Sequence, residues 1–202
     1  VLRNEKMKKV ESENIEQIYS EINKDFNSPS TKIKVDLMYA FNGTGKTRIS
    51  RIFTEKQEDK VLCFNSIFQD EFSWVNDSQF LFINNTTWIV RFITEQGLEN
   101  AIEDNFKLFC DDIIEPSIDL ENGVIGFSAK TKDGYDYDIK ISKAEESLFI
   151  WSIFYTFIDS MIYELKEEKE NRSTDIFDNI KYIVIDDPVS SIDDTRIMNI
   201  AV

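Results

Sequence analysis

Residues 40–47 read Ala-Phe-Asn-Gly-Thr-Gly-Lys-Thr, a glycine-bearing loop between a predicted strand and a predicted helix. The strand covers residues 33–39, where apolar and polar residues alternate at first, and helical sequence follows in residues 48–54. Gly43 and Gly45 allow the backbone to curl so that successive amide groups point at one anion, and the start of the helix adds a favourable dipole. This succession of strand, loop and helix is the context of a phosphate-binding P-loop, and it predicts an α/β fold.

The loop supplies most of the predicted nucleotide-binding residues. Lys46 is expected to reach the β- and γ-phosphates, and the hydroxyl of Thr47 is expected to bind Mg²⁺. Ala40 stands where the usual pattern has its first glycine, a departure that costs little where φ stays negative. A glycine-rich turn with an accidental lysine is the alternative interpretation. The predicted cofactor-binding residues of this segment are Asn42, Gly43, Thr44, Gly45, Lys46, Thr47 and Arg48.

A second candidate site segment is an apolar strand that ends in two acids and a proline, residues 181–188. Its continuous apolar run, residues 182–185, is expected of a strand that is buried on both faces of a parallel sheet. Such a strand can deliver Asp186 to the P-loop, where its carboxylate would hold Mg²⁺. Asp187 would then orient or deprotonate the attacking water, which makes Asp187 and Lys46 the predicted catalytic residues. A strand that ends in a solvated acidic turn is the alternative.

The remaining sequence predicts helices on either side of β-hairpins. Glu145 lies three residues after Ser142, which predicts a capping box at the start of a long apolar helix that continues to Leu165. The other predicted elements are an amphipathic helix in residues 10–26, a strand in residues 61–65 followed by an aromatic-rich loop through Trp74, one long helix in residues 87–109 despite Gly97, and antiparallel hairpins in residues 118–141.

Composition narrows the possible chemistry. The chain has 202 residues, which predicts a single domain, and it has no histidine, which excludes Ser/His/Asp and Cys/His nucleophilic catalysis. Its two cysteines, Cys63 and Cys110, predict neither a zinc site nor a disulfide framework. A formal charge of −15 disfavours non-specific binding of nucleic acid. With no apolar run of membrane-spanning length and no signal peptide, the protein is expected to be soluble and cytoplasmic.

Several motifs together resemble the ATP-binding-cassette and SMC-type ATPases. Residues 189–193, Val-Ser-Ser-Ile-Asp, resemble their D-loop, and residues 141–146 resemble their signature motif, with Ser-Lys-Ala-Glu in place of the usual Ser-Gly-Gly-Glu. More narrowly, residues 39–47, 64–66, 141–143 and 185–191 are similar to the ATPase domain of PrrC-type and RloC-type anticodon nucleases. The resemblance implies a P-loop NTPase of the ABC ATPase type, with a mostly parallel core sheet, an antiparallel β-segment and a helical subdomain.

The resemblance also implies how the site is assembled. Two heads are expected to dimerise head to tail on nucleotide, so that Ser142 at the start of its helix faces the γ-phosphate bound by the other copy. A simple helix cap is the alternative role for Ser142. Gln69 is the candidate for the glutamine that senses Mg²⁺ in the Q-loop, although a solvated loop glutamine is the alternative.

Domain organisation follows from the same resemblance. Residues 1–202 are expected to form one head, with an N-terminal helical segment in residues 1–30, an antiparallel β-segment in residues 118–141 and the signature helix in residues 142–170. The C-terminal part of the head, including the switch histidine, is expected to be missing from these 202 residues. The sequence lacks a heptad stretch of the kind that would predict an SMC-type coiled coil. In PrrC-like proteins a nuclease domain would follow the head.

These observations predict a head that binds and hydrolyses ATP or GTP with Mg²⁺ and gates an effector nuclease, in antiphage or RNA-directed defence. Its expected partners are the nucleotide, a second copy of the chain and a nuclease domain or subunit, with tRNA or DNA contacted only indirectly and no membrane. Asp187 stands where many cassette ATPases have glutamate, which implies slow turnover. The alternative function is therefore a nucleotide sensor or interaction module that binds without hydrolysis. A P-loop kinase is less consistent with the D-loop-like residues 190–193.

Overall fold

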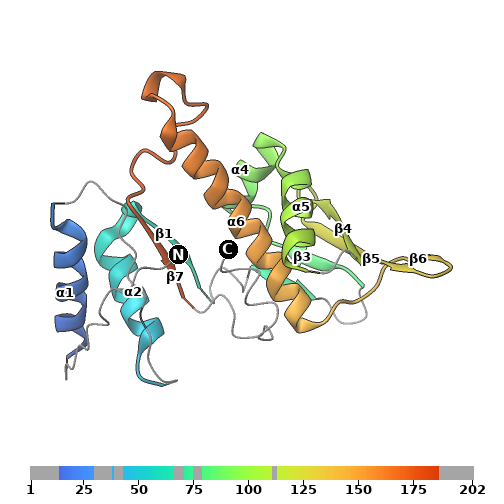
Figure 1. The fold of residues 1–202 in the computed structure, drawn as a ribbon, viewed down its shortest axis with the longest axis horizontal. Helices are drawn as coiled ribbons and strands as arrows, with labels where there is room; N and C mark the ends of the chain where they lie inside the picture. Colours follow the sequence, from blue (N-terminus) through green and yellow to red (C-terminus); the bar gives the residue numbers. More distant parts are fainter. Residues whose placement is uncertain are drawn as a thin grey trace. The chain divides into compact units, whose positions relative to one another are not determined.

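The computed structural model of the chain describes residues 14–29, 38, 43–65, 71–74, 79–110 and 113–186 (Figure 1). Contacts between Cα atoms divide the chain into two compact units, Val1–Val61 and Leu62–Val202, and we describe each unit by itself. The strand predicted in residues 33–39 lies outside the described residues, except for Met38, which is not in a strand. The expectation of one head that spans the chain stays a prediction.

In the described part of the first unit, two α-helices pack against each other. Helix α1 (Ile15–Asn27) starts at the N-cap Asn14, whose side chain accepts a hydrogen bond of 2.9 Å from the amide of Glu16. This helix therefore begins later than the predicted residue 10. Helix α2 (Lys46–Gln57) begins inside the predicted P-loop and is followed by a short 3-10 helix, η1 (Glu58–Lys60). The two α-helices pack through aromatic rings, because α2 buries Phe53 and α1 buries Tyr19.

A long helix forms the centre of the second unit. Helix α6 (Lys143–Lys166) packs against α5 (Glu99–Phe109) (Figure 1). Helix α4 (Trp88–Gln96) precedes α5 in the chain. The prediction of one long helix in residues 87–109 is wrong, because Gly97 adopts a left-handed conformation with a φ of 63° and ends α4. The charged connection after α6 includes a short 3-10 helix, η2 (Lys169–Asn171).

The larger sheet is antiparallel and has five strands, β2 (Phe72–Trp74), β3 (Leu81–Ile83), β5 (Val124–Thr131), β4 (Ile114–Asp119) and, beside β5, β6 (Gly134–Asp136). The predicted hairpins of residues 118–141 are confirmed, and β4 begins at Ile114. The aromatic-rich segment through Trp74 is not only loop, because Phe72 pairs with Ile83 in β3. The sequence analysis did not predict β3.

The smaller sheet pairs β1 (Val61–Phe64) in parallel with β7 (Tyr182–Ile185). Both strands were predicted, but β7 is not buried on both faces, since Ile183 is 39% exposed and Ile185 is 45% exposed. Within the described residues β1 is the one strand that pairs with β7. The structure thus has an α/β fold, and within its described residues the antiparallel sheet is larger than the parallel one.

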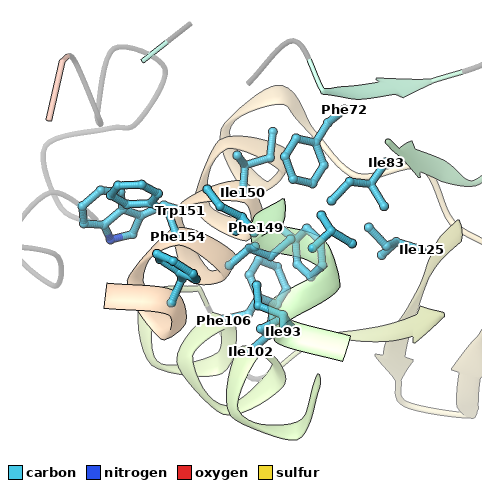
Figure 2. Packing of buried hydrophobic residues seen from close by; sticks show 14 of the residues in the cluster. Phe72, Ile83, Ile93, Ile102, Phe106, Ile125, Phe149, Ile150, Trp151 and Phe154 are labelled. Carbon is cyan, nitrogen blue, oxygen red and sulfur yellow. The ribbon is translucent and has the colours of Figure 1, made fainter. Parts of the chain in front are cut away.

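The core of the second unit lies between α6, α4, α5 and the antiparallel sheet. Figure 2 shows Phe149 and Ile150 of α6 in one apolar cluster with Phe106 of α5 and with Phe72 and Ile125 of the sheet. Phe149 lies edge-on to Phe106, with ring centroids 5.5 Å apart, a favourable geometry for aromatic pairs. In the described part of the chain α6 alone is long and apolar enough to span a membrane, but more than half of that window is buried in the protein, as in a core helix.

Candidate functional site

The described part of the loop before α2 contains two glycines in left-handed backbone conformations. Gly43 has a φ of 79° and Gly45 has a φ of 99°, a region of backbone conformation that residues with a Cβ rarely adopt. Gly45 is the N-cap of α2, and the amide of Ile49 donates a 3.1 Å hydrogen bond to its carbonyl oxygen. The two glycines therefore turn the chain sharply into the start of the helix.

The first turn of α2 favours an anion. Because Gly45 has no side chain, no N-cap side chain accepts a hydrogen bond from the first amide groups of the helix. The first turn contains Lys46 and Arg48 and no acidic residue, although a cation is unfavourable near the positive end of a helix dipole. Lys46 is half-buried, whereas Thr47 and Arg48 are exposed. A bound phosphate would offset this concentration of positive charge.

The acidic end of β7 lies beside the end of β1. Asp186 directly follows Ile185, the last residue of β7, and its amide donates a 2.8 Å hydrogen bond to the carbonyl oxygen of Phe64, the last residue of β1. Phe64 is fully buried against Trp151 of α6, with ring centroids 5.2 Å apart, and this contact anchors the strand pair to the core. Asp186 itself is half-buried. Asp186 thus lies at the carboxyl end of a strand, as the sequence predicted, and its placement beside the P-loop stays a prediction.

The two halves of the predicted site belong to different units. Lys46 and Thr47 lie in the first unit and Asp186 lies in the second, so their convergence on one ion stays a prediction. Within the described residues no group of three or more His, Cys, Asp or Glu side chains is placed to hold a metal. A nucleotide-bound Mg²⁺ usually keeps several waters and takes few protein ligands beside the phosphate oxygens, and a hydroxyl such as that of Thr47 and a carboxylate such as that of Asp186 are suitable ligands.

Ser142 caps α6 as predicted. Its hydroxyl accepts a 3.3 Å hydrogen bond from the amide of Glu145, and its amide donates a 2.7 Å hydrogen bond to the Glu145 carboxylate. The capping box is therefore confirmed. Capping uses the hydroxyl only as an acceptor, so its hydrogen can still be donated to a phosphate on another molecule. Ser142 is exposed, which a contact with a second copy requires.

A buried carboxylate beside Ser142 was missed by the sequence analysis. Glu146 is only 5% exposed, and its two oxygens accept hydrogen bonds from Lys143 Nζ at 2.6 Å and from Trp74 Nε1 at 2.9 Å. These contacts fix the first turn of α6 to strand β2. The spacing of Lys143 and Glu146 could have predicted their ion pair, but the contact with Trp74 is tertiary and has no local signal.

The other predicted site residues lie outside the described residues. These are Asn42 of the P-loop, Gln69 of the Q-loop-like segment, and Asp187 together with the D-loop-like residues that follow it. Their predicted roles stay predictions. The described part of the site thus contains the second half of the phosphate loop, the start of α2, the end of β7 and the cap of α6.

Comparison with known proteins gives one informative similarity. The chain is 34% identical, over 216 aligned positions, to an anticodon nuclease of Escherichia coli, and the alignment covers 93% of this chain. It covers 54% of the relative, so the chain spans about half the length of that curated protein. No family model matches the chain, and no solved structure matches it. The similarity supports a relation between this chain and the PrrC-type anticodon nucleases.

Proposed function

We propose that this chain binds Mg²⁺-ATP or Mg²⁺-GTP and hydrolyses it, and that it thereby controls a nuclease that cleaves tRNA in cellular defence. The observation that carries the nucleotide-binding part is the pair of positive-φ glycines, Gly43 and Gly45, directly before a helix whose first turn contains Lys46, Thr47 and Arg48. The similarity to an anticodon nuclease supports the link to tRNA cleavage. The expected compartment is the cytoplasm, where tRNA is found.

The proposed chemistry assigns one role to each group. Backbone amides of the loop bind the β-phosphate, and Lys46 neutralises the charge that develops on the γ-phosphate. Thr47 and Asp186 would hold Mg²⁺, which would neutralise phosphate charge. Asp187 positions the attacking water and accepts its proton. Because its side chain is one methylene shorter than that of glutamate, we expect slow turnover. Without histidine in the chain, a carboxylate is the suitable base.

Dimerisation is the proposed link between nucleotide and effector. The exposed hydroxyl of Ser142 would donate a hydrogen bond to the γ-phosphate held by a second copy, so that two nucleotides join two heads. Hydrolysis would then release the dimer and change the state of the nuclease. The effector is expected to contact tRNA, because a head with a formal charge of −15 disfavours phosphate backbones.

The test combines calorimetry, phosphate release and light scattering. Wild-type chain should bind nucleotide and release phosphate, Asp187→Asn should bind without releasing phosphate and accumulate as a dimer, and Lys46→Ala should not bind. Unchanged nucleotide affinity in Lys46→Ala would contradict the proposed site. Tight binding by the wild type with no phosphate release would favour the non-hydrolysing sensor.

A further inference from the structure

The phosphate loop lies next to the start of α1. A Cβ placed on Gly45 would lie 3.6 Å from Cδ1 of Ile15, the first residue of α1. Apart from the two chain neighbours of Gly45, Ile15 is the one residue of the described chain within 4 Å of that position. The side chain of Ile15 therefore borders the space beside the N-cap of α2 into which a side chain at residue 45 would extend. This position places an element that has no motif of its own beside the loop that we propose binds nucleotide.

Several contacts hold α1 in place along α2. The rings of Tyr19 and Phe26 lie edge-on to Phe53 of α2, with centroid distances of 5.8 Å and 6.1 Å. At the last residue of α2, Gln57 Nε2 donates hydrogen bonds of 3.0 Å to Tyr19 Oη and of 3.0 Å to Asn23 Oδ1. The position of α1 is thus fixed by both apolar and directional polar contacts.

An ion pair strengthens the same interface. Lys56 forms an ion pair with Glu16, and its Nζ lies 4.5 Å from the centroid of the Tyr19 ring. Because α1 begins beside the N-cap of α2 and is hydrogen-bonded to the last residue of α2, it cannot shift along α2 without breaking that hydrogen bond or moving Ile15 away from Gly45. The side chain of Ile15 is therefore held at Gly45 by the rest of the helix interface.

The physical consequence concerns the freedom of the loop. Glycine has more accessible backbone conformations than other residues. Ordering a loop with two positive-φ glycines around an anion therefore costs conformational entropy, and this cost weakens the observed affinity. A fixed apolar group against Gly45 removes part of that freedom before the anion arrives. Preorganisation of this kind increases affinity without adding any contact to the ligand.

We propose that Ile15 is a positioning residue for the phosphate loop and that α1, through Ile15, sets the affinity of the loop for nucleotide phosphates. The inference rests on the proposed function, since it names a determinant of the same site. Ile15 acts through Gly45 and does not itself touch the nucleotide. An event that moves α1 would consequently change nucleotide affinity from outside the site.

The experiment compares two alanine substitutions in one helix of the full chain. Ile15→Ala removes the group at Gly45, and Ile22→Ala removes the same atoms from a position on α1 that does not contact Gly45. Calorimetry with Mg²⁺-ATP should give a dissociation constant about three- to fivefold higher for Ile15→Ala, as expected from the freedom restored to one glycine. Ile22→Ala should bind like wild type, and Ile15→Leu should restore affinity. Equal changes in both alanine variants, or none in either, would overturn the proposal.

A second measurement separates this inference from the proposed function. In the absence of nucleotide, amide hydrogen exchange at Gly45 should be faster in Ile15→Ala than in wild type or Ile22→Ala. If the wild type binds no nucleotide, the proposed function fails, and faster exchange still shows that Ile15 orders the loop. Unchanged exchange at Gly45 in Ile15→Ala would overturn the positioning role whatever the binding result.

Discussion

Gly45 and Gly97 show how one backbone conformation can be used in two ways. Gly45 has a φ of 99° before α2, and Gly97 has a φ of 63° after α4. An alanine at either position is strained by roughly 1–2 kcal/mol, so both variants should unfold at lower temperature. Only Gly45→Ala should also lose nucleotide binding in calorimetry. If Gly97→Ala lost nucleotide affinity to the same extent, the effect of Gly45→Ala would be one of general stability and not of the site.

Asp178 allows a prediction about pH at a single residue. Hydrogen bonds from Lys169 and from Arg172 hold the pKa of Asp178 below its usual value of 3.8. A carboxyl with a lower pKa in the folded state stabilises the protein above its unfolded pKa, and this stability is lost as the pH falls through its folded pKa. Asp178→Asn should therefore lower the melting temperature at pH 7, and the difference should shrink below about pH 4.

The matched control for that experiment is Asp175→Asn, which changes an exposed carboxyl three residues away. Asp175→Asn should leave the melting curve close to that of wild type at both pH values. A difference between Asp178→Asn and wild type that stayed constant from pH 7 to pH 3 would contradict the assigned ion pairs.

At the scale of elements, the cap of α6 can be separated from its proposed role in the dimer. Ser142→Ala removes an N-cap side chain and should destabilise the protein by about 1 kcal/mol. Ser142→Asp retains a capping oxygen and should unfold close to wild type, but its negative charge would repel a γ-phosphate. Light scattering with nucleotide should then find a dimer in wild type and none in Ser142→Asp. A nucleotide-dependent dimer of Ser142→Asp would limit Ser142 to its role as a cap.

The elements with a strong local signal were those that the sequence predicted. The capping box of Ser142 and Glu145 marked the start of α6, and turn residues marked the hairpins of β4, β5 and β6. Strands β2 and β3 have three residues each, too few for an alternation of apolar and polar side chains to be recognised. The sequence analysis did not predict that Gly97 ends α4, because the apolar periodicity continues on both sides of it. The left-handed backbone of Gly97 nevertheless ends the helix.

The candidate site shows the same limit of local information. The positive φ of Gly43 and Gly45 and the position of Asp186 after β7 follow from short sequence patterns. The exposure of Ile183 and the hydrogen bond between Trp74 and Glu146 depend on which distant segments of the chain pack together, and no short sequence pattern contains that information. The position of α1 beside the phosphate loop belongs to this second kind as well.

At the scale of the whole molecule, the central prediction is that two segments about 140 residues apart in sequence hold one Mg²⁺. Mg²⁺ should increase nucleotide affinity in wild type. Thr47→Val removes the ligand of one segment, and Asp186→Asn removes the ligand of the other, so each should reduce this increase without abolishing Mg²⁺-free binding. A control, Asp136→Asn, changes an exposed carboxyl on β6 and should leave the increase intact.

The double variant decides whether the two ligands share an ion. If Thr47 and Asp186 bind the same Mg²⁺, most of the increase is already lost in each single variant, and the double variant should lose little more. The double-mutant cycle should then give an interaction free energy of about 0.5–3 kcal/mol. If the two losses simply added, or if Asp186→Asn retained the full effect of Mg²⁺, the two segments would act separately. The first unit would then bind nucleotide without help from β7, and the proposed route to hydrolysis through Asp187 would fail.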